Sequence, residues 1–91
     1  MKSIVQDDLT RCFICGRTGV EIHHVMSGVA NRPLSTKYKL LVALCPAHHR
    51  GKNGVHQDYS LNVFVKQCAQ SAFEKKHGHE MWMKLFQKNY L

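Results

Sequence analysis

Residues 44–50 read LCPAHHR, and within them Cys45 and His48 are separated by two residues. The stretch CFICG at positions 12–16 carries a second pair with the same gap, Cys12 and Cys15. A gap of two residues lets a tight turn present both side chains to one tetrahedral ion, and soft thiolates favour Zn²⁺ over hard cations. The two pairs therefore predict one structural zinc site with four protein ligands.

The chemistry of these cysteines depends on the compartment. The first eight residues, MKSIVQDD, lack the apolar stretch of a signal peptide and carry two acids. We therefore expect the chain to stay in the cytoplasm, where thiols are kept reduced. There the two pairs are interpreted as metal ligands, and a reducible disulfide is the alternative interpretation.

Length and charge limit the classes of function. A chain of 91 residues is expected to form a single domain, and one so short usually needs a metal, a disulfide or a partner for stability. Its 13 basic and 6 acidic side chains give a net charge of +7, which favours a polyanionic partner such as nucleic acid. The longest apolar run, at positions 40–45, is far shorter than the ~20 residues that cross a bilayer, so no membrane association is expected.

The chain changes character near position 57. Positions 11–57 are rich in cysteine, histidine, glycine and arginine, and are expected to form the metal-binding part. The β-branched stretch 20–25 predicts a strand, a loop is expected over 26–37, and 38–44 predicts a second strand. Pro46 can open a helical turn that carries the histidines of LCPAHHR.

Positions 58–91 are expected to be helical. Ser60 can cap a first helix that Gly78 ends, and the apolar residues between them recur with helical spacing. This stripe consists of Leu61, Phe64, Val65, Cys68, Ala69, Ala72 and Phe73. Within it, Cys68 is interpreted as a packing residue rather than a reactive thiol. A last helix is expected over 79–88, and its apolar face consists of Trp82, Leu85 and Phe86.

Four further histidines lie in the basic middle of the chain: His23, His24, His49 and His56. Neighbours on a strand point to opposite faces, so His23 and His24 cannot share one ligand role. One of them could bind a second metal while the other faces a substrate. Histidines satisfied within a core are the alternative interpretation.

The charges around these histidines are of one sign. Between Glu21 and Asp58 the sequence contains no acidic residue. The basic residues of the same stretch are Arg32, Lys37, Lys39, Arg50 and Lys52. Such a segment suits a phosphodiester substrate, and an ordinary solvated surface is the alternative.

Three strings together resemble the HNH, or ββα-metal, nuclease motif: EIHH at 21–24, LCPAHHR at 44–50 and GVH at 54–56. The segments GVANR at 28–32, LSTKY at 34–38 and NYL at 89–91 are similar to a small phage and prophage branch related to the Ref-type (recombination enhancement function) nucleases. The resemblance covers nearly the whole chain from Cys12 onward. It implies a small α+β domain in which a zinc-stapled ββα-metal core is followed by two C-terminal helices.

The resemblance also implies roles for the side chains. His24 corresponds to the general base, and the ligands of a catalytic metal would be His23, His49 and His56. This second divalent cation would be Mn²⁺, Ni²⁺, Mg²⁺ or Zn²⁺, and three imidazoles disfavour Mg²⁺. DNA phosphates would be contacted by Arg32, Lys37, Arg50 and Lys52.

The implied activity is hydrolysis of DNA with little sequence specificity, leaving 5′-phosphate and 3′-hydroxyl ends. The implied setting is phage or prophage recombination or DNA processing in a bacterial cell, with a recombinase as a further candidate partner. Two features depart from the family pattern. Residues 51–54 separate His49 from His56, and the family's middle Asn is replaced by the stretch KLL at 39–41.

Two other classes of function are left open. A catalytically inactive, zinc-stapled DNA-binding module would bind DNA without a second metal and would not cut it. A protein-interaction domain would use the helix at 82–90 as its contact face and would show no salt-sensitive affinity for DNA. Neither class needs the histidines outside the zinc pairs, so the nuclease is the preferred hypothesis.

Overall fold

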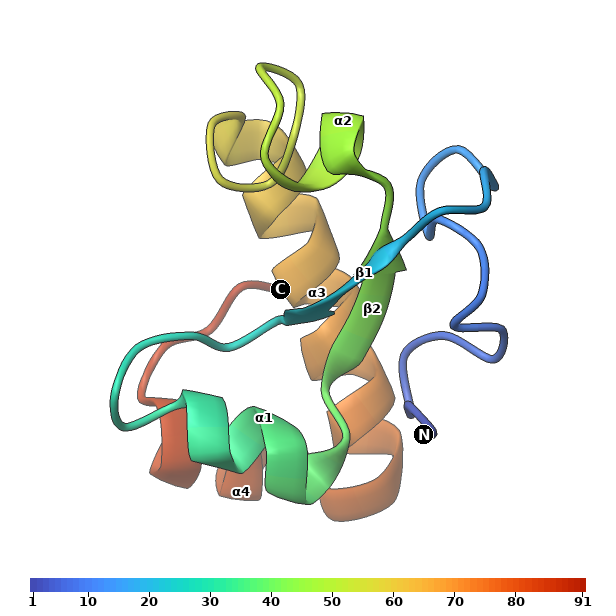
Figure 1. Cartoon of the computed structure of the whole chain (residues 1–91). Coiled ribbons are helices and arrows are strands. Elements are labelled where there is room, and N and C mark those ends of the chain that lie inside the picture. The colour runs from blue at the N-terminus through green and yellow to red at the C-terminus, as the bar shows by residue number, and fades with distance from the viewer.

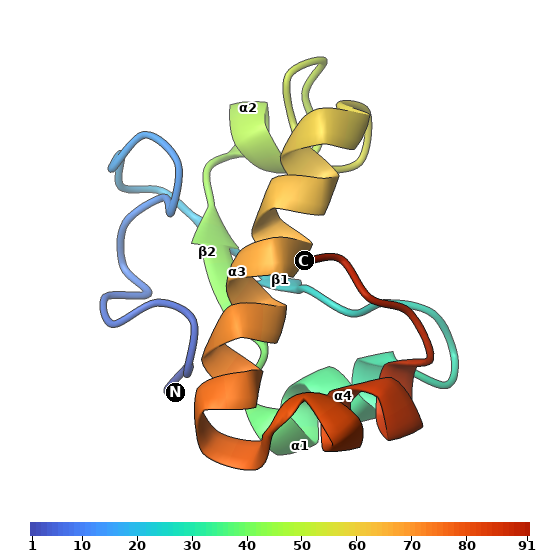
Figure 2. The same cartoon turned by 180° about the vertical axis from the view of Figure 1, so that it is seen from behind.

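The computed structural model describes all residues from Met1 to Leu91. Strands β1 (Glu21–His24) and β2 (Leu41–Leu44) form a two-stranded antiparallel sheet, which α3 crosses on one face (Figures 1 and 2). The helices are α1 (Arg32–Tyr38), α2 (Pro46–His49), α3 (Tyr59–His77) and α4 (His79–Phe86). The prediction of a small α+β fold is confirmed.

The sheet sets the position of both histidines of β1. Its register pairs Glu21 with Leu44 and His24 with Leu41, so that the far end of β2 leads directly into α2 beside the start of β1. All four residues of β2 are buried, as expected for an apolar run covered on both faces. The other edge of β2 is covered by the N-terminal segment, in which the Phe13 amide donates to the carbonyl of Ala43 at 2.8 Å. This bond holds the CFICG stretch against the strand.

The segment between the strands differs from the prediction. A loop was expected over 26–37 and a strand from 38, but residues 32–38 form α1 and β2 begins only at Leu41. Pro33 suits the first turn of this helix, and the fully buried Ser35 hydroxyl bonds the amide and the carbonyl of Met26. Lys39 ends the helix in the left-handed region, with a φ of 59°. The apolar residues of this stretch do not recur at helical spacing, so the sequence did not predict so short a helix.

The long helix α3 ends as predicted but starts differently. The residue that caps its N-terminus is Asp58, whose carboxylate accepts the amide of Leu61, and not Ser60. Gly78 ends it with a φ of 85°. The buried stripe is narrower than expected: Val65, Ala69 and Phe73 are buried, whereas Phe64 is 48% exposed. Cys68 is half-buried on the flank of the stripe, where it lines a surface hollow, and burial raises the pKa of its thiol.

The last helix, α4, stops at Phe86 rather than at position 88, because Gln87 adopts a left-handed φ of 60°. Trp82 is fully buried and Phe86 nearly so, and both belong to the main core. Trp82 and Phe86 are therefore not free to contact a partner protein, as the alternative of an interaction domain required of this face. None of the helices is long and apolar enough to span a membrane.

Candidate metal centres

The four residues of the predicted zinc site lie together. Their ligand atoms, the sulfurs of Cys12, Cys15 and Cys45 and a ring nitrogen of His48, all lie within 4.8 Å of one another. The Cys15 and Cys45 sulfurs are 3.7 Å apart, and His48 Nδ1 lies 3.3 Å and 3.8 Å from the sulfurs of Cys45 and Cys12. A tetrahedral ion with Zn–S bonds of about 2.3 Å requires sulfur pairs about 3.8 Å apart. The cluster could therefore hold an ion such as zinc.

Two local turns build this cluster. In the first, Gly16 adopts a φ of 79° and its amide donates to the carbonyl of Cys12, which closes the CFICG turn. In the second, the amides of His48 and His49 donate to the carbonyl of Cys45 as α2 begins. Burial opposes ionisation of the Cys12 thiol, but hydrogen bonds from nearby backbone amides outweigh it and lower its pKa to about 6. The thiol is therefore ionised at neutral pH, the form that binds metal.

A second cluster is formed by His23 on β1, His49 at the end of α2 and His56 in the following loop. One ring nitrogen of each lies within 4.8 Å of the others, and the ring centroids are 4.8 Å to 5.3 Å apart. Burial, followed by the charges of His49 and His56, lowers the pKa of His23 to about 4. The trio could hold a metal ion, and three protein ligands leave part of its coordination open to a substrate.

A carboxylate fixes the orientation of one ring in this histidine trio. Glu21 Oε1 accepts a hydrogen bond from His49 Nδ1 at 2.8 Å, which leaves the other ring nitrogen of His49 for a ligand. Glu21 also pairs with the guanidinium of Arg50. The hydrogen bond from His49 and the charge of Arg50 lower the pKa of Glu21, so its carboxylate stays ionised. Such a partner behind a ligating histidine sets its tautomer and raises its basicity.

We expect Glu21→Gln to weaken binding of Mn²⁺ or Ni²⁺ at the histidine trio about tenfold to hundredfold, because a neutral amide orients His49 less strongly. Calorimetric titration of the zinc-loaded protein measures this. The matched control is Glu74→Gln, since Glu74 holds His79 through the same contact at 2.8 Å, outside both clusters. Equal affinities in Glu21→Gln and wild type would contradict the role of Glu21.

Residues 51–54, which separate His49 from His56 and depart from the nuclease motif, form a tight turn in the structure. Helix α2 ends at His49, and residues 51–54 turn the chain back, so that the amide of Val55 donates to the carbonyl of His48 at 2.9 Å. The turn is close enough that a Cβ on Gly54 would lie 2.8 Å from backbone atoms of His48 and His49. Only glycine fits there, and the close approach brings His56 beside His49 without a continuous helix.

We expect Gly54→Ala to destabilise the protein by about 1–3 kcal/mol, because the added methyl meets backbone that cannot move aside cheaply. Denaturant unfolding of the variant beside Asn53→Ala, an exposed neighbour, measures the difference. The same variant should lose affinity for a cation at the histidine trio. A stability equal to that of Asn53→Ala would show that the turn has room for a side chain.

The histidine trio opens into a cleft of about 740 Å³. His24 lines this cleft from β1, and Arg32 and Thr36 line it from α1, together with the 27–29 loop. Burial and the charge of Arg32 lower the pKa of His24, which keeps its imidazole neutral at pH 7. His23 belongs to the trio and His24 does not, although both reach the cleft. Strand geometry predicted that the two would not share one ligand role, but not which of them would join the other histidines.

The four basic residues predicted to contact DNA differ in their position relative to the cleft. Arg32 lies in the wall of the cleft. Arg50 is paired with Glu21, so its charge is partly neutralised. Lys37 is exposed on α1, where its ammonium lies 5.4 Å from the ring of Tyr38, and Lys52 is exposed in the turn after α2. Of the four, Arg32 has the most direct access to a ligand in the cleft.

Sequence reasoning missed the roles of Glu21 and Gly54. The signal for Glu21 was present, because Glu21 and His23 are two positions apart on a strand and so share one face. Comparisons of the chain with protein-family models, with curated proteins and with solved structures found no match. The chain is therefore assigned to no family, and its function is argued from the geometry of the two clusters.

Proposed function

We propose that this chain is a metal-dependent DNA endonuclease of the ββα-metal type. The observation that carries the proposal is the convergence of His23, His49 and His56 at a cleft that also contains His24 and Arg32. This set combines a possible cation site with open positions, a neutral imidazole and a fixed positive charge. Each of the three can contribute to hydrolysis of a phosphodiester, as proton acceptor, as anchor for the phosphate and as stabiliser of the charge that develops.

The order of the elements supports the proposal. The paired histidines are on β1, the third histidine is on α2 directly after β2, and the CFICG and LCPAHHR turns join the two ends of this unit through the cysteine cluster. A β–β–α unit that carries its ligands at these places is what the ββα-metal class uses. Here α1 is inserted between the strands and supplies the arginine of the cleft wall.

The proposed mechanism divides the work between these groups. A divalent cation bound by the histidine trio would supply positive charge to the phosphate oxygens as negative charge develops there. His24, neutral at pH 7, accepts a proton from the attacking water as its oxygen bonds to phosphorus. The bond from phosphorus to the 3′ oxygen breaks, and this oxygen takes a proton from solvent in the open cleft and leaves as a hydroxyl. Arg32 attracts and orients the phosphate in the cleft, and Glu21 holds the ring of His49. The cysteine cluster takes no part in the reaction and fixes the start of α2.

Nicking of supercoiled plasmid tests the proposal. The zinc-loaded protein is freed of loosely held cations and then assayed with Mn²⁺, Ni²⁺, Mg²⁺ or Zn²⁺ added in turn, for wild type and His49→Ala. The control is His79→Ala, which removes a carboxylate-bonded histidine outside the cleft. Cation-dependent nicking that His49→Ala loses and His79→Ala keeps supports the nuclease. DNA binding without nicking under any cation would instead identify a zinc-stapled binding module.

A further inference from the structure

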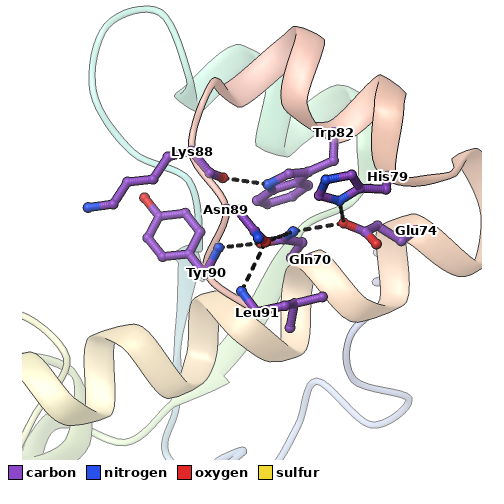
Figure 3. A network of polar contacts seen from close by, with 8 residues as sticks. All are labelled: Gln70, Glu74, His79, Trp82, Lys88, Asn89, Tyr90 and Leu91. Atoms are coloured by element: carbon purple, nitrogen blue, oxygen red, sulfur yellow. Dashed lines mark hydrogen bonds and ion pairs between the residues drawn. The ribbon is translucent and has the colours of Figure 1, made fainter.

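The segment that follows α4 is held firmly in place, although it contains no helix or strand. Residues 87–91 return alongside α3 (Figure 2), and the fully buried Gln70 side chain accepts the amide of Tyr90 and donates to the side chain of Asn89 (Figure 3). The side-chain amide of Gln67 donates to the backbone carbonyl of Tyr90, and the Trp82 indole donates to the backbone carbonyl of Lys88. No part of the endonuclease mechanism uses this network.

The network fixes the ring of Tyr90 beside two lysines. The ammonium of Lys66 lies 5.4 Å from the ring centroid, and that of Lys88 lies 5.2 Å from it. Figure 3 shows the Tyr90 and Lys88 side chains extending away from the Gln70 network. Neither lysine pairs with a carboxylate: the ion pairs of this chain involve Glu21 and Glu74. Two like charges held at one ring without an acid favour an anionic ligand.

Lys66 also lies on the side of α3 that faces the histidine trio. Asn62, one helical turn earlier, donates to the carbonyl of Val55, next to His56. Lys66 and the loop that carries His56 therefore lie on the same side of α3. Burial lowers the pKa of Lys66 and the charge of Lys88 adds to this, as expected when two cations approach one another.

We propose that Lys66 and Lys88, set around Tyr90, form a binding site for a backbone phosphate of the nucleic acid whose scissile phosphate lies at the histidine trio. This inference rests on the proposed function and adds a second contact point for the same strand. Arg32 holds the strand from α1, and the lysine pair holds it from α3 and the 87–91 segment. The contact positions the strand and reads no base sequence.

The test is the affinity of a fluorescent DNA duplex, measured by anisotropy without added cation, for wild type and for Lys66→Gln/Lys88→Gln. Each phosphate contact contributes about 0.9 to the slope of log affinity against log salt. The double variant should therefore bind roughly tenfold or more weakly at about 0.1 M salt, with a slope less steep by about 1, because the two lysines hold one phosphate. Lys66→Arg/Lys88→Arg should restore binding.

The matched control is Lys75→Gln/Lys76→Gln, which removes the same charge from a different surface hollow of α3. An equal loss in this control, or full affinity in Lys66→Gln/Lys88→Gln, would overturn the lysine site. A site for free phosphate alone would also overturn it, and would appear as inorganic phosphate binding that depends on both lysines while duplex affinity does not. Plasmid nicking is read separately, so a protein that binds DNA through these lysines but never cuts it would refute the nuclease and keep the lysine site.

Discussion

Cys45→Ser is expected to abolish cooperative folding of this protein at 37 °C. Cys45 is buried, its sulfur lies 3.7 Å from that of Cys15 and 3.3 Å from His48 Nδ1, and its carbonyl accepts the first amides of α2. Serine keeps the shape but removes a thiolate ligand, so the cluster would lose the zinc ion that we expect to join the N-terminal turn to the end of β2. Loss of any of the other three ligands of this cluster should have a comparable effect.

The size of this effect follows from comparing the stability of a small domain with the free energy that a structural zinc site contributes. A domain of this size is typically stable by about 5–15 kcal/mol. A structural zinc site contributes an apparent free energy of about 10–16 kcal/mol where it is coupled to folding. Losing most of that contribution exceeds what the apolar core retains, because a chain of 91 residues buries a limited fraction of its surface. Removal of zinc by a strong chelator should therefore unfold the wild type as well.

Circular dichroism during thermal unfolding, with metal content measured by elemental analysis, checks this prediction. Wild type should carry one tightly held zinc and Cys45→Ser none at this cluster. Cys68→Ser is the control, since Cys68 is half-buried on α3 and outside the cluster, and its change should stay within about 1 kcal/mol. A folded, zinc-free Cys45→Ser protein would show that the apolar core alone maintains the fold.

The metal-ligating clusters could be predicted from the sequence better than the helices and strands that connect them. Two ligand pairs with equal gaps define a cluster whatever the path between them, because a tetrahedral ion constrains the ends and not the connection. The connection itself was predicted wrongly, since α1 is short and depends on Pro33 and on the Ser35 hydroxyl bonding Met26, a contact formed only in the folded chain. Tertiary contacts of this kind leave no periodic signal.

For the histidine trio too, some features could be predicted from the sequence and others depend on contacts formed only in the folded chain. Strand alternation separated His23 from His24, and in the structure only His23 belongs to the trio. The resemblance grouped His56 with His49, but the residues alone could not show how the chain brings them together, because that depends on the close approach of Gly54 to the backbone of α2. Nor could the sequence show the lysine pair, since Lys66 and Lys88 are brought together by the buried Gln70 holding Tyr90.

His24→Ala is expected to lower the nicking rate about 10²- to 10⁴-fold while leaving DNA affinity and metal content unchanged. His24 lines the cleft but lies outside the histidine trio, so its removal takes away a proton acceptor without removing a ligand. Imidazole added to the solution should restore part of the rate, because the cleft is open and the deleted ring leaves space. His49→Ala should not respond to imidazole in this way once its metal is lost.

The pH profile distinguishes a base from a structural histidine. Burial and the charge of Arg32 hold the pKa of His24 below its ordinary value of 6.5, so the imidazole remains neutral and able to accept a proton well into mildly acidic solution. The wild-type rate should therefore be level near pH 7 and should fall only at a pH below the ordinary imidazole pKa of 6.5, where protonation removes the acceptor. Metal content measured at each pH separates this fall in rate from a fall caused by release of the cation from the histidine trio.

Over the pH range in which the metal content is full, the residual rate of His24→Ala should not show the fall in acidic solution. A wild-type rate that rises from pH 7 to pH 5, or equal rates for the two proteins, would exclude His24 as the base and assign its position in the cleft to binding alone.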